Sequence, residues 1–127
     1  MSGRPELSIF SADGVGGVLA SALDGISARQ NVIADNIANV DTPGFRASSV
    51  DFETQLKSAI SDGSFEKGVD SVTATTSPTD TPVGANGNNV DLRKETMAAV
   101  QSQYQYQILT RAVSERFDLV KTAATGM

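Results

Sequence analysis

Apolar residues recur along residues 13–40 with the spacing of an amphipathic helix. One series repeats every seven residues, and a second lies four residues after it. The first series is Leu19, Ile26, Ile33 and Val40, and the second is Leu23, Gln30 and Ile37. This is the a/d arrangement of a coiled-coil seam with one polar member. We therefore expect a helix over residues 13–40, about 42 Å long at 1.5 Å per residue, after a flexible N-terminus at residues 1–12.

A second periodic segment, residues 91–124, predicts a still longer helix with Asp91 as its N-cap. Its apolar residues form two stripes. One stripe is Leu92, Ala99, Tyr106, Leu109, Val113, Phe117, Val120 and Ala124, and the other is Met97, Val100, Tyr104, Ile108, Ala112, Leu119 and Ala123. A helix that is apolar on two faces needs neighbours on both, whereas this chain offers one other long helix. The second stripe therefore predicts contacts with other subunits.

The residues between these helices, 41–90, follow neither pattern. Pro43 disfavours helical geometry at the residue before it, and Pro43-Gly44 suits the centre of a type II turn, so the first helix should stop here. A short amphipathic segment follows at residues 47–61. Residues 62–90 are dominated by Gly, Ser, Thr, Asp, Asn and Pro, which predicts a long loop with room for a strand pair around Ser71–Thr76.

The predicted fold class is therefore mainly α, with a single domain over residues 1–127. Long N- and C-terminal helices are joined by a turn, a short amphipathic segment and a Gly/Ser/Thr-rich loop region in which a short β-hairpin can form.

Composition restricts the chemistry that the chain can perform. It has 127 residues, a formal net charge of -5, and neither histidine nor cysteine. The commonest acid–base side chain and most zinc and copper ligands are therefore absent, and the acidic balance disfavours nucleic acid and anionic lipid as partners. Asp13, Asp24 and Asp35 lie on one helix face but about 16 Å apart along it, too far to share an ion. We expect no catalytic, cofactor or metal site.

The sequence shows no targeting signal. No stretch reaches the roughly 18 apolar residues of a membrane span, and Met1–Asp13 lacks the basic start and apolar run of a secretory signal. These features place the chain in the cytoplasm, unless it leaves by a route that cleaves no signal.

The most informative motif ends the first helix and enters the turn. Its distinctive members are Asn36, Asn39, Asp41, Thr42, Pro43, Gly44 and Phe45. Locally it indicates a capped helix end, since Asn and Asp side chains bond free backbone groups. The longer run Asn31–Phe45 resembles the N-terminal signature of the flagellar basal-body rod and hook family, an alanine-rich helix ending in Asn-Ile-Ala-Asn and then Thr-Pro-Gly-aromatic.

Two further segments resemble the same family. Asn88-Asn-Val-Asp-Leu92 is similar to the start of the family's C-terminal segment, although Arg93 and Lys94 stand where acidic residues often follow. The run from Arg116 to Ala123 resembles the ending of the proximal-rod (FlgB) type, and the length suits the short rod proteins. The sister short-rod (FlgC) type remains an alternative, as does a small helical adaptor or export chaperone.

The resemblance implies an architecture and a role. The terminal helices would pair as an antiparallel coiled coil and pack with other subunits into a helical tube, the rod that crosses the periplasm as a drive shaft for motility. Implied partners are the chain itself, FlgC-, FlgF- and FlgG-type rod proteins, the FliE-type adaptor and the MS ring at the rod base. The flagellar type III export apparatus would deliver the subunit without a cleaved signal. Neither nucleic-acid binding nor direct membrane insertion is implied.

Antiparallel pairing also implies which residues meet. The helix-pairing interface would consist of Leu19, Ile26 and Ile33 against Leu109, Val113, Phe117 and Val120. The intersubunit interface would then contain Tyr104, Ile108, Ala112 and Leu119. Phe52 and Leu56 resemble the Phe-x-x-x-apolar element that engages the export gate in this family, and a simple packing contact is an equally weighted alternative.

Overall fold

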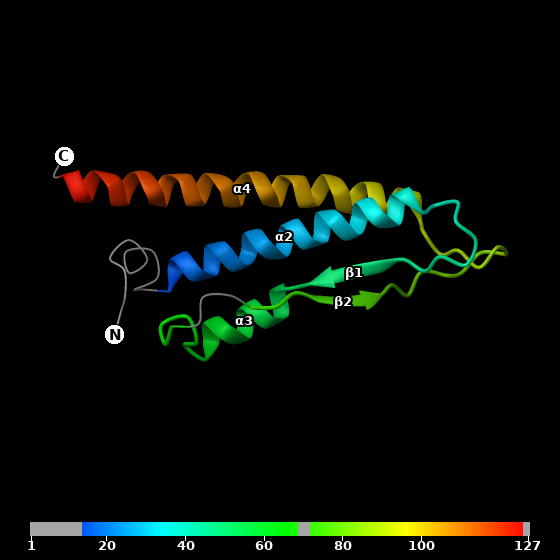
Figure 1. Ribbon diagram of the computed structural model, residues 1–127, viewed down its shortest axis with the longest axis horizontal. Helices are drawn as coiled ribbons and strands as arrows, with labels where there is room; N and C mark the ends of the chain where they lie inside the picture. The colour runs from blue at the N-terminus through cyan, green and yellow to red at the C-terminus, as the bar shows by residue number, and fades with distance from the viewer. Residues whose placement is uncertain (1–13, 69–71, 126–127) are drawn as a thin grey trace.

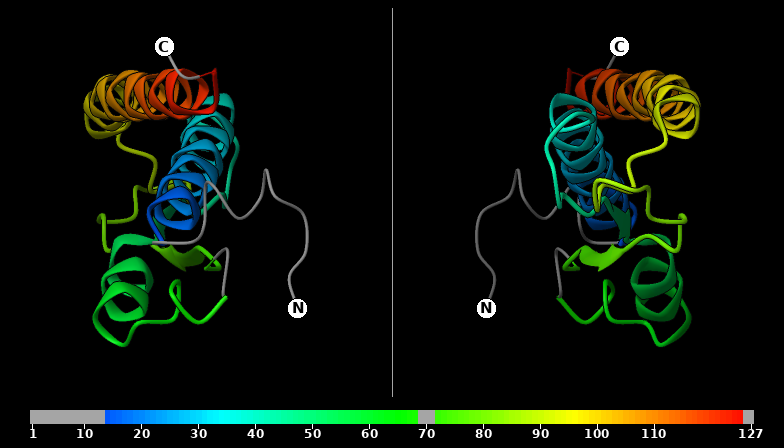
Figure 2. Two further views of the ribbon diagram at one scale, coloured as in Figure 1. Left: turned by 90° about the vertical axis from the view of Figure 1, so that its left-hand side faces the viewer. Right: turned by 90° about the vertical axis from the view of Figure 1, so that its right-hand side faces the viewer.

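The computed structural model describes residues 14–68 and 72–125. The elements in chain order are α2 (Val15–Ala38), β1 (Ser48–Asp51), α3 (Glu53–Ser61), β2 (Thr75–Pro78) and α4 (Leu92–Thr125). Helices α2 and α4 run antiparallel along the long axis, and the β1–β2 pair and α3 lie on the other side of α2 (Figure 1). The end-on views in Figure 2 show α2 as the middle of three layers. The mainly α prediction, with long terminal helices packed together, is confirmed.

The two long helices begin and end within two residues of their predicted bounds. Asp91 accepts a hydrogen bond from the Lys94 backbone N–H at 3.2 Å, so it caps the first turn of α4 as expected. Helix α2 starts after Gly14, whose φ of 81° is accessible to glycine without strain. Residues 1–12 and Asp13 lie outside the described part of the chain.

The middle region contains the expected two-stranded antiparallel sheet, but its strands come from distant segments. Ser48 pairs with Pro78 and Asp51 with Thr75. The predicted pair around Ser71–Thr76 thus contributes only its last residues to β2, and Ser71 lies outside the described residues. The partner strand, β1, lies within residues 47–61, the segment predicted to be amphipathic. Val50 of this strand is buried.

The core lies between α2 and the segment that follows β1. Ala22, Ile26 and Phe52 form the buried cluster, and Leu56, Ala74 and Leu109 pack against it. Phe52 is 4% exposed and lies directly on the backbone of α2 at Gly25, where a Cβ atom would come within 2.2 Å of the phenyl ring. Burial of a side chain of this size stabilises the fold by about 1.5–3 kcal/mol.

Candidate functional site

The turn after α2 and the loop before α4 form one end of the molecule, which we call the tip (residues 39–46 and 79–89; Figure 1). The turn is closed by its own backbone, with Thr42 N–H bonded to the Asn39 carbonyl at 3.0 Å and Phe45 N–H to the Thr42 carbonyl at 3.2 Å. The Thr42 hydroxyl also donates to Asn39 Oδ1 at 3.0 Å. Gly44 has a φ of 78°, the left-handed geometry that favours glycine.

The loop before α4 locks this turn. The Asn88 amide donates to the carbonyls of Asn39 and Thr42, each at 2.8 Å. Asn89 Oδ1 accepts the Ala47 N–H at 2.6 Å, and the Asn89 N–H reaches the Phe45 carbonyl at 3.2 Å. The two asparagines are buried. The two segments that carry the family resemblance, Asn31–Phe45 and Asn88–Leu92, therefore meet in one hydrogen-bonded unit at the tip.

Asn36 joins three elements in the interior. Its amide nitrogen donates to the Ser48 carbonyl at 2.8 Å and to Glu95 Oε1 at 3.0 Å, and its amide oxygen accepts the Ser48 N–H at 3.2 Å. Asn36 and Glu95 are buried. This motif residue therefore ties α2 to β1 and α4, whereas Asp41, Pro43 and Gly44 of the same motif are exposed.

The residues of α4 that face α2 recur every seven residues along the helix, and the two that are buried lie outside the predicted apolar stripes. We call this series the seven-residue line. Its buried positions are Glu95 and Ser102, and Leu109, seven residues further, packs on the core. The first two are polar, so a search for apolar periodicity misses them. The line continues to Arg116, which borders the space between the helices together with Val113 and Leu19.

The residues predicted for helix pairing differ in their burial. Ile26 and Ile33 are buried, and Leu19, Leu109, Val113 and Val120 are partly buried. Phe117 differs, because its side chain is 54% exposed. Arg116 belongs to the seven-residue line, and Phe117 is the residue after it. One residue corresponds to a turn of about 100° around the helix, so the Phe117 side chain points away from the contact.

The residues predicted for intersubunit contact lie mostly on the exposed face of α4. Tyr104 is 64% exposed, Ile108 67% and Leu119 70%, while Ala112 is partly covered. A shallow groove along this face is bordered by Lys94, Thr96, Met97, Ala98, Val100, Gln101, Tyr104, Gln105 and Ile108. Residues 96–110 contain no Asp, Glu, Lys or Arg, so four turns of helix present an uncharged surface.

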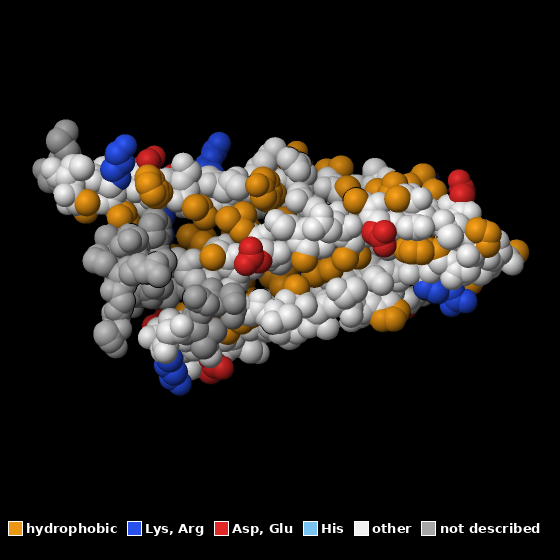
Figure 3. Space-filling model, in the orientation of Figure 1, with side chains coloured by type: hydrophobic (Ala, Val, Ile, Leu, Met, Phe, Trp, Pro, Cys, Tyr) orange, Lys and Arg blue, Asp and Glu red, His pale blue; other side chains and the backbone are white. Residues whose placement is uncertain are grey.

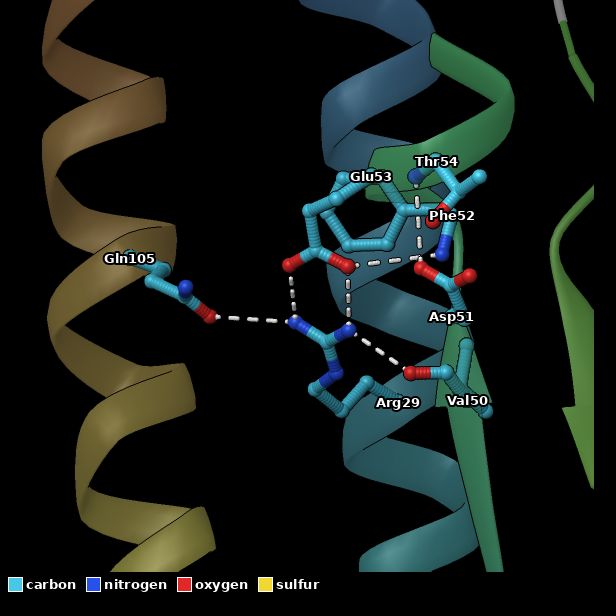
Figure 4. A network of polar contacts seen from close by, with 7 residues as sticks. All are labelled: Arg29, Val50, Asp51, Phe52, Glu53, Thr54 and Gln105. Carbon is cyan, nitrogen blue, oxygen red and sulfur yellow. Dashed lines mark hydrogen bonds and ion pairs between the residues drawn. The ribbon is translucent and has the colours of Figure 1, made fainter. Parts of the chain in front are cut away.

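Arg29 is the centre of a polar network that sequence reasoning missed (Figure 4). Its two terminal nitrogens donate to the two oxygens of Glu53 at 2.8 and 2.6 Å, and one also donates to the Val50 carbonyl at 2.7 Å. Its guanidinium lies 4.9 Å from the centroid of the Phe52 ring, within the range of cation–π attraction. Nothing in the spacing of a single arginine on α2 indicates a partner 24 residues away.

The Arg29 hydrogen bond lowers the pKa of Glu53 below its usual value, and partial burial of the carboxylate opposes that shift. The network covers one face of Phe52, and Leu56 packs on the same core. Both residues of the predicted export element are therefore packing residues in the folded chain.

Two of the three aspartates predicted to share one helix face lie within the described residues. Asp24 and Asp35 are exposed on α2, and within the described ranges no three potential ligands come together to hold a metal ion. In that same part of the chain, no helix has the length and hydropathy needed to cross a membrane.

Comparison with known proteins agrees with this description. A family model described as "Flagella basal body rod protein" matches residues 18–46. Relatives from several bacteria carry the name "Flagellar basal body rod protein FlgB". The one from Bacillus subtilis is 35% identical over 117 residues, covering 85% of this chain and 91% of the relative. The one from Borreliella burgdorferi is 35% identical over 113 residues, covering 75% and 84%, and the one from Escherichia coli 35% over 104 residues, covering 68% and 75%. The chain belongs to the FlgB family of flagellar basal body rod proteins, a family of structural, non-enzymatic subunits.

Proposed function

We propose that this chain polymerises through α2 and α4 into the proximal rod, and that the rod crosses the periplasm as the drive shaft that transmits torque. The observation that carries the proposal is the exposed face of α4. Large apolar side chains there, Tyr104, Ile108 and Leu119, are more than half exposed in the single chain. Contiguous apolar surface of this kind is typical of interaction sites.

The chemistry of this face indicates what covers it. Charged residues are depleted in the core of protein interfaces, whereas tyrosine and methionine are enriched, and residues 96–110 combine these features. We infer that helices of neighbouring rod subunits pack here. Each large apolar side chain that becomes buried would contribute about 1.5–3 kcal/mol.

The remaining partners follow from the same role. The neighbours are further copies of the chain, FlgC-, FlgF- and FlgG-type rod proteins, and at the base the FliE-type adaptor and the MS ring. The flagellar type III export apparatus delivers the subunit without cleaving a signal. Since Phe52 is buried beneath Arg29, the Phe52–Leu56 element can reach an export gate only before the chain folds.

The experiment separates export from assembly. Tyr104→Ala and Ile108→Ala should be secreted at parental levels, because neither side chain contributes to the core, but cells that carry them should fail to build a rod and to swim. Lys57→Ala on α3, also exposed, is the matched control and should swim normally. Normal swimming of both α4 variants, or failure of both to accumulate as protein, would contradict the assignment of this face.

A further inference from the structure

The loop between β2 and α4 contains the one Asn-Gly pair of the chain, Asn86-Gly87. Asn86 is exposed at the tip, which projects from the end of the molecule (Figure 3). Asparagine is among the chemically labile residues of proteins. Its side-chain amide carbon can be attacked by the backbone nitrogen of the next residue, and glycine obstructs that attack least because it has no Cβ.

The geometry of the loop accounts for the presence of both residues. Gly87 has a φ of 80°, and a Cβ there would come within 3.2 Å of the Gly44 Cα atom, so a larger residue would be strained. Asn86 Oδ1 accepts a hydrogen bond from the Asn88 backbone N–H at 3.1 Å, a local bond for which asparagine is favoured in turns. The turn that the tip requires therefore brings a reactive pair with it.

Three backbone hydrogen bonds surround Asn86 in the folded chain. Gly87 N–H donates to the Gly84 carbonyl at 2.9 Å, and Gly84 N–H donates to the Asn88 carbonyl at 2.8 Å. The Asn86 carbonyl accepts the Gly44 N–H, from the turn after α2, at 3.0 Å. These bonds fix the backbone on both sides of the reactive pair, so its atoms change position only when the loop opens locally.

The bond from Gly87 to Gly84 closes a β-turn that has Ala85 and Asn86 at its centre. Within the described residues only glycines have a positive φ, so the turn is of type I and Asn86 has a ψ of about 0°. Attack on the side chain requires the Gly87 nitrogen to give up the proton that it donates to Gly84, and then to approach the amide carbon. Both steps require the turn to open, so the fold opposes the reaction.

We propose that Asn86 is a site of spontaneous deamidation, which the folded tip suppresses and the unfolded chain allows. The Gly87 nitrogen forms a bond to Cγ of Asn86, its proton passes to the side-chain nitrogen, and that nitrogen leaves as ammonia. Water then opens the cyclic imide at either carbonyl, which gives aspartate or isoaspartate. The net reaction consumes water and releases ammonia, and it uses no other reactant. Neither step involves the face of α4 proposed above as an interface.

The two products differ in their effect on the tip. Aspartate keeps the backbone of the loop and a side-chain oxygen that accepts the Asn88 N–H. In isoaspartate the backbone runs through the side-chain carbons, and the carbonyl that accepted the Gly44 N–H becomes a free carboxylate. The bonds that join the two loops of the tip are then disrupted. A chain that folds promptly keeps its tip, whereas a chain that stays unfolded accumulates this change.

The rates of deamidation in the folded and the unfolded full-length chain test the proposal. One sample is kept in native buffer and another in guanidinium chloride, both at the same mildly alkaline pH, and peptide mass spectrometry measures conversion at residue 86. Conversion should be at least about tenfold faster in the unfolded chain, equivalent to about 1.4 kcal/mol of protection. A rate in the folded chain that equals or exceeds the unfolded rate would overturn the proposal, as would no conversion of the unfolded chain.

A second measurement asks whether the bonds of the tip provide the protection. The Asn88 side chain donates to the carbonyls of Asn39 and Thr42 at 2.8 Å, so Asn88→Ala separates the loop from the turn after α2. With its helix content verified by circular dichroism, this variant should deamidate in native buffer at least about tenfold faster than the parent. Lys57→Ala on α3, an exposed position, is the matched control and should deamidate at the parental rate. A parental rate in folded Asn88→Ala would contradict protection by the tip.

Hydrogen exchange at the Gly44 amide distinguishes the two products. Asn86→Asp supplies the aspartate product directly and should protect this amide as the parent does. The purified isoaspartyl fraction should exchange it at least about tenfold faster. Equal protection of the amide in the isoaspartyl fraction and the parent would overturn the proposed effect on the tip.

Discussion

Gly25 lies in the middle of α2, at the point where Phe52 packs on the helix. Replacement of a helical glycine by alanine normally stabilises a protein by about 0.5–1 kcal/mol. Here the new Cβ would lie 2.2 Å from Cγ of Phe52 and 2.4 Å from Cδ1, so the ring must move. Arg29 and the core residues Ala22 and Ile26 hold the ring in place.

We therefore expect Gly25→Ala to destabilise the chain. Overpacking of a well-packed core typically costs about 1–3 kcal/mol, which exceeds the gain in helix propensity and reverses the sign. The measurement is urea unfolding of the purified chain, followed by far-ultraviolet circular dichroism. Ala34→Gly, at an exposed position of the same helix, is the matched control for helix propensity and should be destabilising by about 0.5–1 kcal/mol.

A double-mutant cycle assigns the cost to the ring. Phe52→Ala alone should cost about 3–5 kcal/mol. In the Phe52→Ala background, Gly25→Ala should recover its ordinary stabilising effect, because the clashing atoms are gone. Two results would refute the packing described for Phe52. One is a Gly25→Ala variant as stable as the parent, and the other is a loss of stability from Gly25→Ala that remains in the Phe52→Ala background.

Three further results are expected. Asn36→Ala should cost about 1–3 kcal/mol in urea unfolding, because it leaves the buried Glu95 side chain and the Ser48 backbone without their partner; a cost below that of an exposed control would contradict its role. Phe117→Ala should lower the free energy of unfolding clearly less than Leu109→Ala, since Phe117 is 54% exposed and Leu109 packs on the core. A larger loss for Phe117→Ala in the same assay would contradict the placement of Leu109, rather than Phe117, on the face of α4 that meets α2. The hydrogen bond from Arg29 lowers the pKa of Glu53 in the folded chain. The stabilisation from this bond is therefore fully present above the ordinary pKa of 4.5 and is lost as the pH falls through the lower pKa of the folded chain. Glu53→Gln should therefore cost a few tenths to about 1 kcal/mol at neutral pH and nothing in strong acid, and a difference from the parent that does not shrink on acidification would contradict this.

Sequence periodicity predicted the parts of the fold that depend on local geometry. The seven-residue repeat through Ile26 and Ile33 located α2 and its buried side, because helical spacing alone decides which residues share a face. Asp91 located the start of α4 because a cap acts within one turn. The run from Arg116 to Ala123 favoured the FlgB type over its sister, and the relatives confirm that choice.

The features that could not be predicted depend on contacts between distant residues. Asn36 and Glu95 meet 59 positions apart, and Arg29 and Glu53 meet 24 positions apart, so no local pattern marks either pair. The buried line of α4 begins with two polar residues, Glu95 and Ser102, which apolar periodicity does not mark. Lys94, which stands where acidic residues often follow in the family, donates to the Thr81 hydroxyl at 3.2 Å in the loop before α4.

We propose above that the uncharged face of α4 becomes buried between subunits in the basal body. Gln101 borders the groove on this face and is exposed in the single chain. Gln101→Cys introduces one thiol into a chain without cysteine, and its rate of labelling by a maleimide can be compared in the purified monomer and in isolated basal bodies. We expect rapid labelling of the monomer and at least about tenfold slower labelling of the rod. Equal rates in the two states would contradict it.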